Sequence, residues 1–290
     1  MRTFIIYLFA SVLSFSAPVA DFATALEQSK TTKAPIAVLI HGSDWNQQAE
    51  VFATAWKDPK FTSATGDLLL VSIDRKESPS DEEVKAAKRN EACQPPYRSL
   101  PCVALYDSEG RLVVVRSGVS EIMASKGLPG TIKAMRVVLT ERDALWAKAA
   151  TASGPQKATF LGAGLDRMNQ GLGPKNLYKP VLDQMKAADP KDESGYIGKY
   201  TFSHWDLLFM VMDKAKKNEH AAAEEELAKW NRNTRLNTKQ RQELHATRYA
   251  LYQRWPEKKD SVRSALLDMQ KADPKSDLGL AAAKQLELLK

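Results

Sequence analysis

The sequence predicts an α/β domain with a mixed central sheet and flanking helices, followed by an all-α domain of repeated helical hairpins. Short apolar runs of strand length alternate with helical patterns in the first half of the chain. Beyond residue 154 the β-branched runs disappear, and a segment that begins at Leu182 recurs 84 residues later at Leu266. We therefore expect an α/β domain over residues 21–150 and a helical domain over residues 151–290.

The N-terminus has the layout of a secretory signal peptide. Arg2 precedes an apolar run over residues 4–15, and small residues follow this run. The run is shorter than a membrane-spanning helix needs. We expect residues 1–20 to be a signal peptide, cut after Ser16 or Ala20. The mature protein is then extracytoplasmic, either periplasmic or secreted, and not stably inserted in a membrane. A retained anchor is the alternative.

The elements of the first domain alternate in an order typical of a mixed sheet. Residues 35–40 form a continuous apolar run, as expected of a strand that is buried on both faces. Asp58 before Pro59 predicts a helix start, and Ser80 with Glu83 has the spacing of a capping box. Further strands are expected at 68–73, 103–106 and 112–116, and further helices at 45–56, 80–92 and 131–149.

Two short motifs in this domain resemble the thioredoxin-like superfamily. Gly42-Ser43-Asp44-Trp45 follows the first strand, and Ser99-Leu100-Pro101-Cys102 precedes the third. The first motif is similar to extracytoplasmic members that carry Gly-Ser-Asp-Trp-Cys-x-x-Cys, and the resemblance covers residues 30–150. It implies a thioredoxin-like fold, with Pro101 as the family's cis-proline. It also implies that Leu100 and Pro101, beside Trp45, form an edge that pairs with the backbone of an extended peptide.

The chain departs from this family at the residues that carry its chemistry. Asn46 and Ala49 occupy the positions of the two redox cysteines, and Ile40 occupies the position of a buried acid. The family's reaction needs a thiolate at a helix N-terminus and a second thiol that resolves the mixed disulfide. An amide and a methyl group supply neither thiol. The sequence therefore predicts a redox-degenerate motif at Trp45, Asn46 and Ala49.

The two cysteines of the chain, Cys93 and Cys102, lie outside that motif. A structural disulfide between them is the first expectation, because the compartment is oxidising and the enclosed loop contains several prolines. Such a bond would contribute about 2.5–3 kcal/mol in the chain-entropy model. Two alternatives are a pair of inert thiols and a relocated redox pair.

Other candidate chemistry is sparse. His41 follows the first strand, but no serine or cysteine nucleophile is near it in the sequence, so we interpret it as a satisfied polar group. The four histidines are scattered, without His-Glu-x-x-His spacing, and there is no Gly-rich phosphate loop. We therefore expect no metal and no cofactor.

The second domain is interpreted as stacked helical hairpins. Hairpins are expected at 154–196, 201–235 and 238–282, forming a short α-solenoid or bundle. In each copy of the repeat an Asp-Pro pair, at Asp189 and at Asp273, is expected to open the next helix. The helix at 203–217 is apolar nearly all round, which predicts a central buried helix; the alternative is that part of it lines a partner groove.

Charge and motifs together favour a binding protein over an enzyme. Residues 1–150 carry a net charge of +1 and residues 151–290 carry +6. The leading hypothesis is protein or peptide binding, or scaffolding, and no nucleic acid is expected. A thiol–disulfide oxidoreductase that uses Cys93 and Cys102 is the alternative. Binding of an anionic polymer by the basic helical half ranks last, because no dense basic cluster is present.

Overall fold

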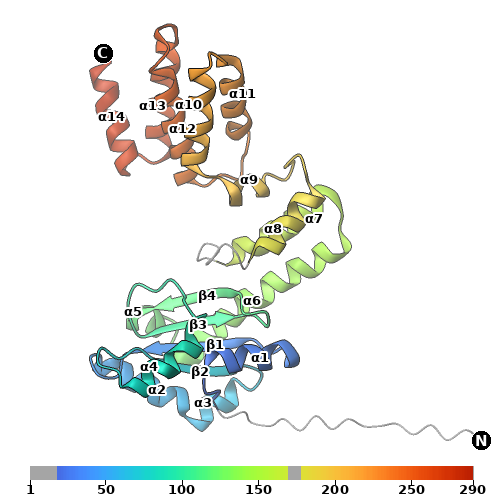
Figure 1. Cartoon of the computed structure of the whole chain (residues 1–290), viewed down its shortest axis with the longest axis vertical. Helices are drawn as coiled ribbons and strands as arrows, with labels where there is room; N and C mark the ends of the chain where they lie inside the picture. Colours follow the sequence, from blue (N-terminus) through green and yellow to red (C-terminus); the bar gives the residue numbers. More distant parts are fainter. Residues whose placement is uncertain (1–17, 169–177, 290) are drawn as a thin grey trace, which may run out of the picture. The chain divides into compact units, whose positions relative to one another are not determined.

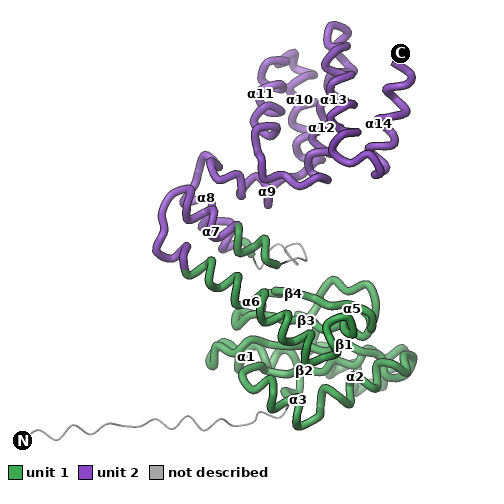
Figure 2. Tube along the Cα trace, turned by 180° about the vertical axis from the view of Figure 1, so that it is seen from behind, with its two compact units in different colours: residues 1–147, 163–179 green, residues 148–162, 180–290 purple. Residues whose placement is uncertain are grey.

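The computed structural model describes residues 18–168 and 178–289. The predicted signal peptide, residues 1–20, lies outside this part of the chain except for its last three residues. The chain divides into two compact units, residues 1–147 with 163–179 and residues 148–162 with 180–290 (Figure 2). The two helices α6 (Gly127–Thr151) and α7 (Gly154–Arg167) contribute residues to both units.

The first unit contains a four-stranded mixed sheet, as the sequence predicts (Figure 1). Its strands are β1 (Ile36–His41), β2 (Leu69–Asp74), β3 (Cys102–Tyr106) and β4 (Leu112–Ser117). Their order is β2-β1-β3-β4; β1 runs parallel to β2 and antiparallel to β3, and β4 is antiparallel to β3. Every residue of β1 is buried, which explains its continuous apolar run.

Besides its share of α6 and α7, the described part of the first unit contains six helical segments. They are α1 (Phe22–Thr32), α2 (Gln47–Lys57), α3 (Pro59–Ala64), α4 (Asp81–Ala87), the 3-10 helix η1 (Lys88–Asn90) and α5 (Gly118–Ala124). The Asp58 side chain accepts from the Lys60 N–H at 2.7 Å with Pro59 in the first turn, and Ser80 with Glu83 forms the predicted capping box. These local signals were sufficient to place two helix starts.

A buried ion pair fixes the turn between β3 and β4 to α6. Asp107 Oδ2 accepts from Arg142 Nη1 at 2.9 Å and from Arg111 Nε at 2.8 Å. Asp107 and Arg142 are 4% and 2% exposed. The Trp146 ring lies 4.3 Å from the Arg142 guanidinium carbon and 5.2 Å from that of Arg111. Because both charges are desolvated, removal of either partner would leave a costly unpaired ion.

The described part of the second unit is helical. Besides its share of α6 and α7 it contains α8 (Lys179–Ala188), α9 (Tyr196–Thr201), α10 (His204–Lys216), α11 (His220–Asn231), α12 (Thr238–Tyr252), η3 (Pro256–Lys258), α13 (Lys259–Ala272) and α14 (Asp277–Leu288). Helix α10 packs against α11 and α12, and α13 packs against α12 and α14. The main core of these helices includes Leu207, Val211, Leu227, Leu244, Leu251 and Trp255.

Two expectations for this unit are wrong. The Asp-Pro pairs do not open the next helices, because α9 has Gly195 as its N-cap and α14 has Ser276. Asp189 instead accepts from the N–H groups of Glu193 and Ser194 and so shapes the turn before α9. Helix α10 is also not buried all round, since Trp205 and Phe209 are 74% and 78% exposed.

Candidate functional site

The segment that the sequence predicts to be a degenerate redox motif lies in the loop between β1 and α2. Asn46 is the N-cap of α2, and its Oδ1 accepts from the N–H groups of Gln48 at 3.1 Å and Ala49 at 3.3 Å. Its Nδ2 donates to the carbonyl of Leu100 at 3.1 Å. The structure thus brings together the degenerate motif and the segment before Pro101. Ala49 is fully buried beneath this loop.

The motif loop is anchored to the segment that follows β2. The Trp45 indole N–H donates to the Arg75 carbonyl at 3.0 Å. The Asp44 carboxylate accepts from the N–H groups of Glu77 and Ser78, each at 3.1 Å. A Cβ at Gly42 would lie 2.3 Å from the Trp45 ring, so only glycine fits there. The loop therefore has one defined conformation, in which Trp45 remains 45% exposed.

The Leu100–Pro101 segment faces the motif and is tied to the end of β4. Its peptide bond is cis, as the resemblance implies. The Pro101 carbonyl accepts from the Gly118 N–H at 2.8 Å, and Ser117 Oγ accepts from the Ser99 N–H at 2.9 Å. The Leu100 N–H makes no hydrogen bond to any residue in the described ranges. This edge therefore has one unused backbone donor, while the Leu100 carbonyl is taken by Asn46.

Cys93 and Cys102 are buried, unbonded thiols in this structure. Both are fully buried and their sulfurs are not bonded to each other. Burial raises the pKa of the Cys93 thiol to about 11 and that of Cys102 to about 12. The thiolate is the reactive form of cysteine, so a raised pKa suppresses disulfide exchange. The structural disulfide, the inert thiols and the relocated redox pair all stay predictions for these two cysteines.

The structure places a serine beside His41 that the sequence analysis missed. His41 Nε2 lies 3.1 Å from Ser72 Oγ, and His41 Nδ1 lies 3.6 Å from Asp74 Oδ1. Asp74 also accepts from the Ser43 N–H at 2.9 Å and from the Ser43 hydroxyl at 2.5 Å. In the parallel register of β1 and β2, His41 lies opposite Asp74. The two residues are 33 positions apart, so no local sequence signal predicts that they pair.

This polar cluster is better explained as a buried network than as a catalytic one. His41 is 6% exposed, and its distance to Asp74 exceeds that of a hydrogen bond. Burial lowers the pKa of His41, and Asp74 opposes this shift only in part. The expectation of a satisfied polar group holds for one ring nitrogen only: Nε2 pairs with Ser72, whereas Nδ1 is buried without a hydrogen-bond partner among the described residues.

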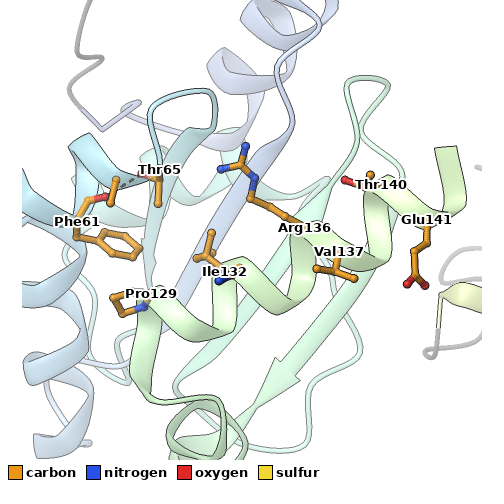
Figure 3. A pocket seen from close by; sticks show the side chains of 10 residues that line it. Phe61, Thr65, Pro129, Ile132, Arg136, Val137, Thr140 and Glu141 are labelled. Atoms are coloured by element: carbon orange, nitrogen blue, oxygen red, sulfur yellow. Dashed lines mark hydrogen bonds between the residues drawn. The ribbon is translucent and has the colours of Figure 1, made fainter. Parts of the chain in front are cut away.

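A separate apolar groove of about 480 Å³ lies between the end of α3 and one face of α6. Figure 3 shows Phe61 facing Pro129 and Ile132, with Arg136, Val137 and Thr140 further along the helix. Arg136 pairs with Asp67, and Glu141 pairs with Arg167 at 3.3 Å. Because Arg136 and Glu141 already have partners, Lys133 is the remaining charged group of the lining, and no predicted site residue lines the groove.

Within residues 18–168 and 178–289, no three His, Cys, Asp or Glu side chains are grouped so that they could hold a metal ion. In the same ranges, no helix combines the length and the apolar character that a membrane span requires.

Comparisons with known proteins give a likeness in structure but none in sequence families. No family model matches the chain, and no curated protein matches it. Among solved structures the chain is similar to one described as DsbH oxidoreductase, with 18% sequence identity and a TM-score of 0.30. The matched region covers 43% of this chain and 92% of that one. The mixed sheet with flanking helices described above fits a thioredoxin-like fold.

Proposed function

We propose that this protein is a redox-degenerate, extracytoplasmic thioredoxin-like protein that binds an extended segment of a partner protein. The observation that carries the proposal is the role of Asn46. Its side chain caps α2 and bonds to Leu100, where the resembled family has a reactive thiol. The site has thus kept a rigid frame without the reactive group, which supports binding rather than electron transfer.

The proposed binding edge consists of Trp45, Leu100 and Pro101, and we add Tyr97, which precedes Leu100 by three residues in the chain. The Leu100 N–H is an unused donor at this edge, so a peptide carbonyl could accept from it as in strand addition. Trp45 and Tyr97 are 45% and 40% exposed and supply apolar contact area. Aromatic side chains of this kind contribute strongly to peptide and protein interfaces.

The alternative, a thiol–disulfide oxidoreductase that uses Cys93 and Cys102, has less support. Both thiols are inside the core that includes Phe22, Ile40 and Tyr106. A substrate disulfide would have to reach a sulfur that has no exposed surface. The raised pKa of each thiol further lowers the population of the attacking thiolate.

The proposal is tested by selecting random 12-residue peptides on the full chain and measuring their affinity by calorimetry. We expect Trp45→Ala and Tyr97→Ala each to lower the affinity for the selected peptides at least tenfold. Val84→Ala is the matched control, because Val84 is 48% exposed on α4 and outside the edge. Insulin reduction by dithiothreitol is measured in parallel, and no acceleration is expected.

Two results would overturn the proposal. One is insulin reduction at a rate typical of thioredoxins, which would restore the oxidoreductase alternative. The other is a set of selected peptides whose affinity is the same for the wild-type chain and both edge variants. That second result would place peptide binding elsewhere on the molecule.

A further inference from the structure

The second unit contains a cavity of about 630 Å³ that no predicted site residue lines. It lies between the turn that follows α8 and the C-terminal end of α11, with α9 along one side. A cavity of this size is within the range that binds small molecules. Its position is independent of the peptide edge, which belongs to the first unit.

Four cationic side chains line this cavity: Lys186, Lys191, Lys229 and Arg232. Among the described residues, Lys186, Lys191 and Arg232 have no ion-pair partner, and Lys229 only approaches Glu226 at 4.0 Å. Two of the cations come from α8 and its following turn and two from the end of α11. An anion between these walls would meet positive charge from both sides.

The acidic residues of the turn do not neutralise these cations by direct pairing. Asp192 lines the cavity, but its carboxylate accepts from the N–H groups of Ile197 at 2.9 Å and Gly198 at 2.8 Å. Asp189 is likewise engaged by the N–H groups of Glu193 and Ser194. Glu193 is the other acid in the lining. The cavity lining therefore has four cations against two acids.

Trp230 adds an aromatic wall to the lining. Its indole Nε1 has almost no accessible surface, so the ring and not the N–H faces the cavity. The ring is held in place by Phe202, whose ring centroid lies 5.1 Å away in an edge-on arrangement.

The cavity is also preformed by the backbone around it. Asp192 and Gly195 have φ angles of 53° and 71°, in the left-handed region. A Cβ at Gly195 or Gly198 would lie 2.8 Å or 2.3 Å from side-chain atoms of Asn233. Asn233 in turn donates to the Gly195 carbonyl at 3.0 Å. The turn is thus closely fitted to the end of α11, so a ligand would meet existing walls.

We infer that this cavity binds a small organic polyanion, through Lys191 and Arg232 on opposite walls. Carboxylate and phosphate groups share the required chemistry, because both present several acceptor oxygens to ammonium and guanidinium donors.

The inference is tested by calorimetric titration of the full chain with citrate and, separately, with inorganic pyrophosphate at low salt. We expect saturable one-to-one binding of at least one anion, weakened several-fold at higher salt. Lys191→Ala and Arg232→Ala should each weaken binding at least tenfold. Trp230→Phe keeps an aromatic ring next to Phe202 and removes only the buried N–H, so it should leave the affinity unchanged.

Lys271→Ala is the matched control, because Lys271 is an exposed cation on α13 outside the cavity. The affinity of this variant for either anion should equal that of the wild-type chain. Binding of citrate alone identifies a carboxylate ligand, and binding of pyrophosphate alone identifies a phosphate ligand. The inference is overturned if neither anion binds saturably, or if Lys271→Ala weakens binding as much as Arg232→Ala, which would indicate diffuse attraction.

Discussion

Asn46 Nδ2 donates a hydrogen bond of 3.1 Å to the carbonyl of Leu100, 54 residues further along the chain. The same side chain accepts from two backbone N–H groups in the first turn of α2. One amide thus caps the helix and joins the degenerate motif to the cis-proline segment. An amide is suited to both roles because it carries an acceptor and two donors, whereas a cysteine thiol is a weak donor and a weak acceptor.

Substitution of Asn46 should separate its two roles. Asn46→Ala removes the cap and the bond to Leu100, so we expect the free energy of unfolding to fall by about 1–3 kcal/mol. Asn46→Asp keeps a capping oxygen but lacks the donor to Leu100, so its free energy of unfolding should fall by less than that of Asn46→Ala. Urea unfolding of both variants measures the two effects. An Asp variant as stable as the wild-type chain would show that the bond to Leu100 contributes no net stability.

The buried thiols should not react in the native protein. Cys93 and Cys102 have no exposed surface, and burial raises their pKa values to about 11 and 12. We expect no labelling by an aromatic disulfide reagent at pH 8 before unfolding. After denaturation without reductant, two thiols per chain should be counted. A count of zero that rises to two on reduction would instead establish the disulfide expected from the sequence.

Local signals in the sequence were sufficient for the elements of the sheet but not for contacts set by strand register. The apolar run at 35–40 predicted β1, and the pair Ser80 with Glu83 predicted a capping box, because both are short-range effects. Ser72 and His41 meet only because β1 and β2 pair in parallel. The sequence also could not show which side of α10 would be covered, since apolar residues lie on all its sides.

Substitutions in helix α10 test which of its sides is covered by other helices. Leu207 is 2% exposed, whereas Trp205 and Phe209 on the same helix are 74% and 78% exposed. Leu207→Ala should lower the free energy of unfolding by about 2–5 kcal/mol, because it creates a cavity. Trp205→Ala and Phe209→Ala should each change it by less than about 0.5 kcal/mol. Large losses in the aromatic variants, measured by urea unfolding, would mean that this face is covered.

His245 should make the stability of the chain depend on pH. Burial, followed by the charge of Arg248, lowers the pKa of His245 from 6.5 to about 4. Arg248 Nη1 lies 3.0 Å from His245 Nδ1, a bond that requires an unprotonated acceptor. The unfolded chain therefore binds more protons between pH 6.5 and pH 4, and stability falls as the pH is lowered through this range.

His245→Gln keeps an acceptor near Arg248 and removes the titration. We expect the difference in unfolding free energy between this variant and the wild-type chain to shift in favour of the variant as the pH falls from 7 to 4.5. Urea unfolding at several pH values measures that difference. A difference that is constant with pH would contradict the depressed pKa, whatever other groups titrate in both proteins.

Cysteines introduced at positions 46 and 49 should form a disulfide if the motif is correctly aligned. Position 46 is the N-cap of α2, where a thiolate would face the N–H groups of Gln48 and Ala49. Its pKa should then lie below the free value of about 8.5. The chain with Asn46→Cys and Ala49→Cys should lose two reactive thiols under mild oxidation, while Asn46→Cys alone should lose none to an internal bond.

Activity of this double variant in insulin reduction should be measurable but weak. Ile40, fully buried, supplies no acid to manage the proton of the resolving thiol. The sulfur at position 49 also enters a site with no exposed surface, which slows its access to a mixed disulfide. The native Cys93 and Cys102 serve as an internal control, since their burial keeps them out of the thiol count. If the new cysteines cannot be oxidised to a disulfide, residues 43–49 do not correspond to the redox motif.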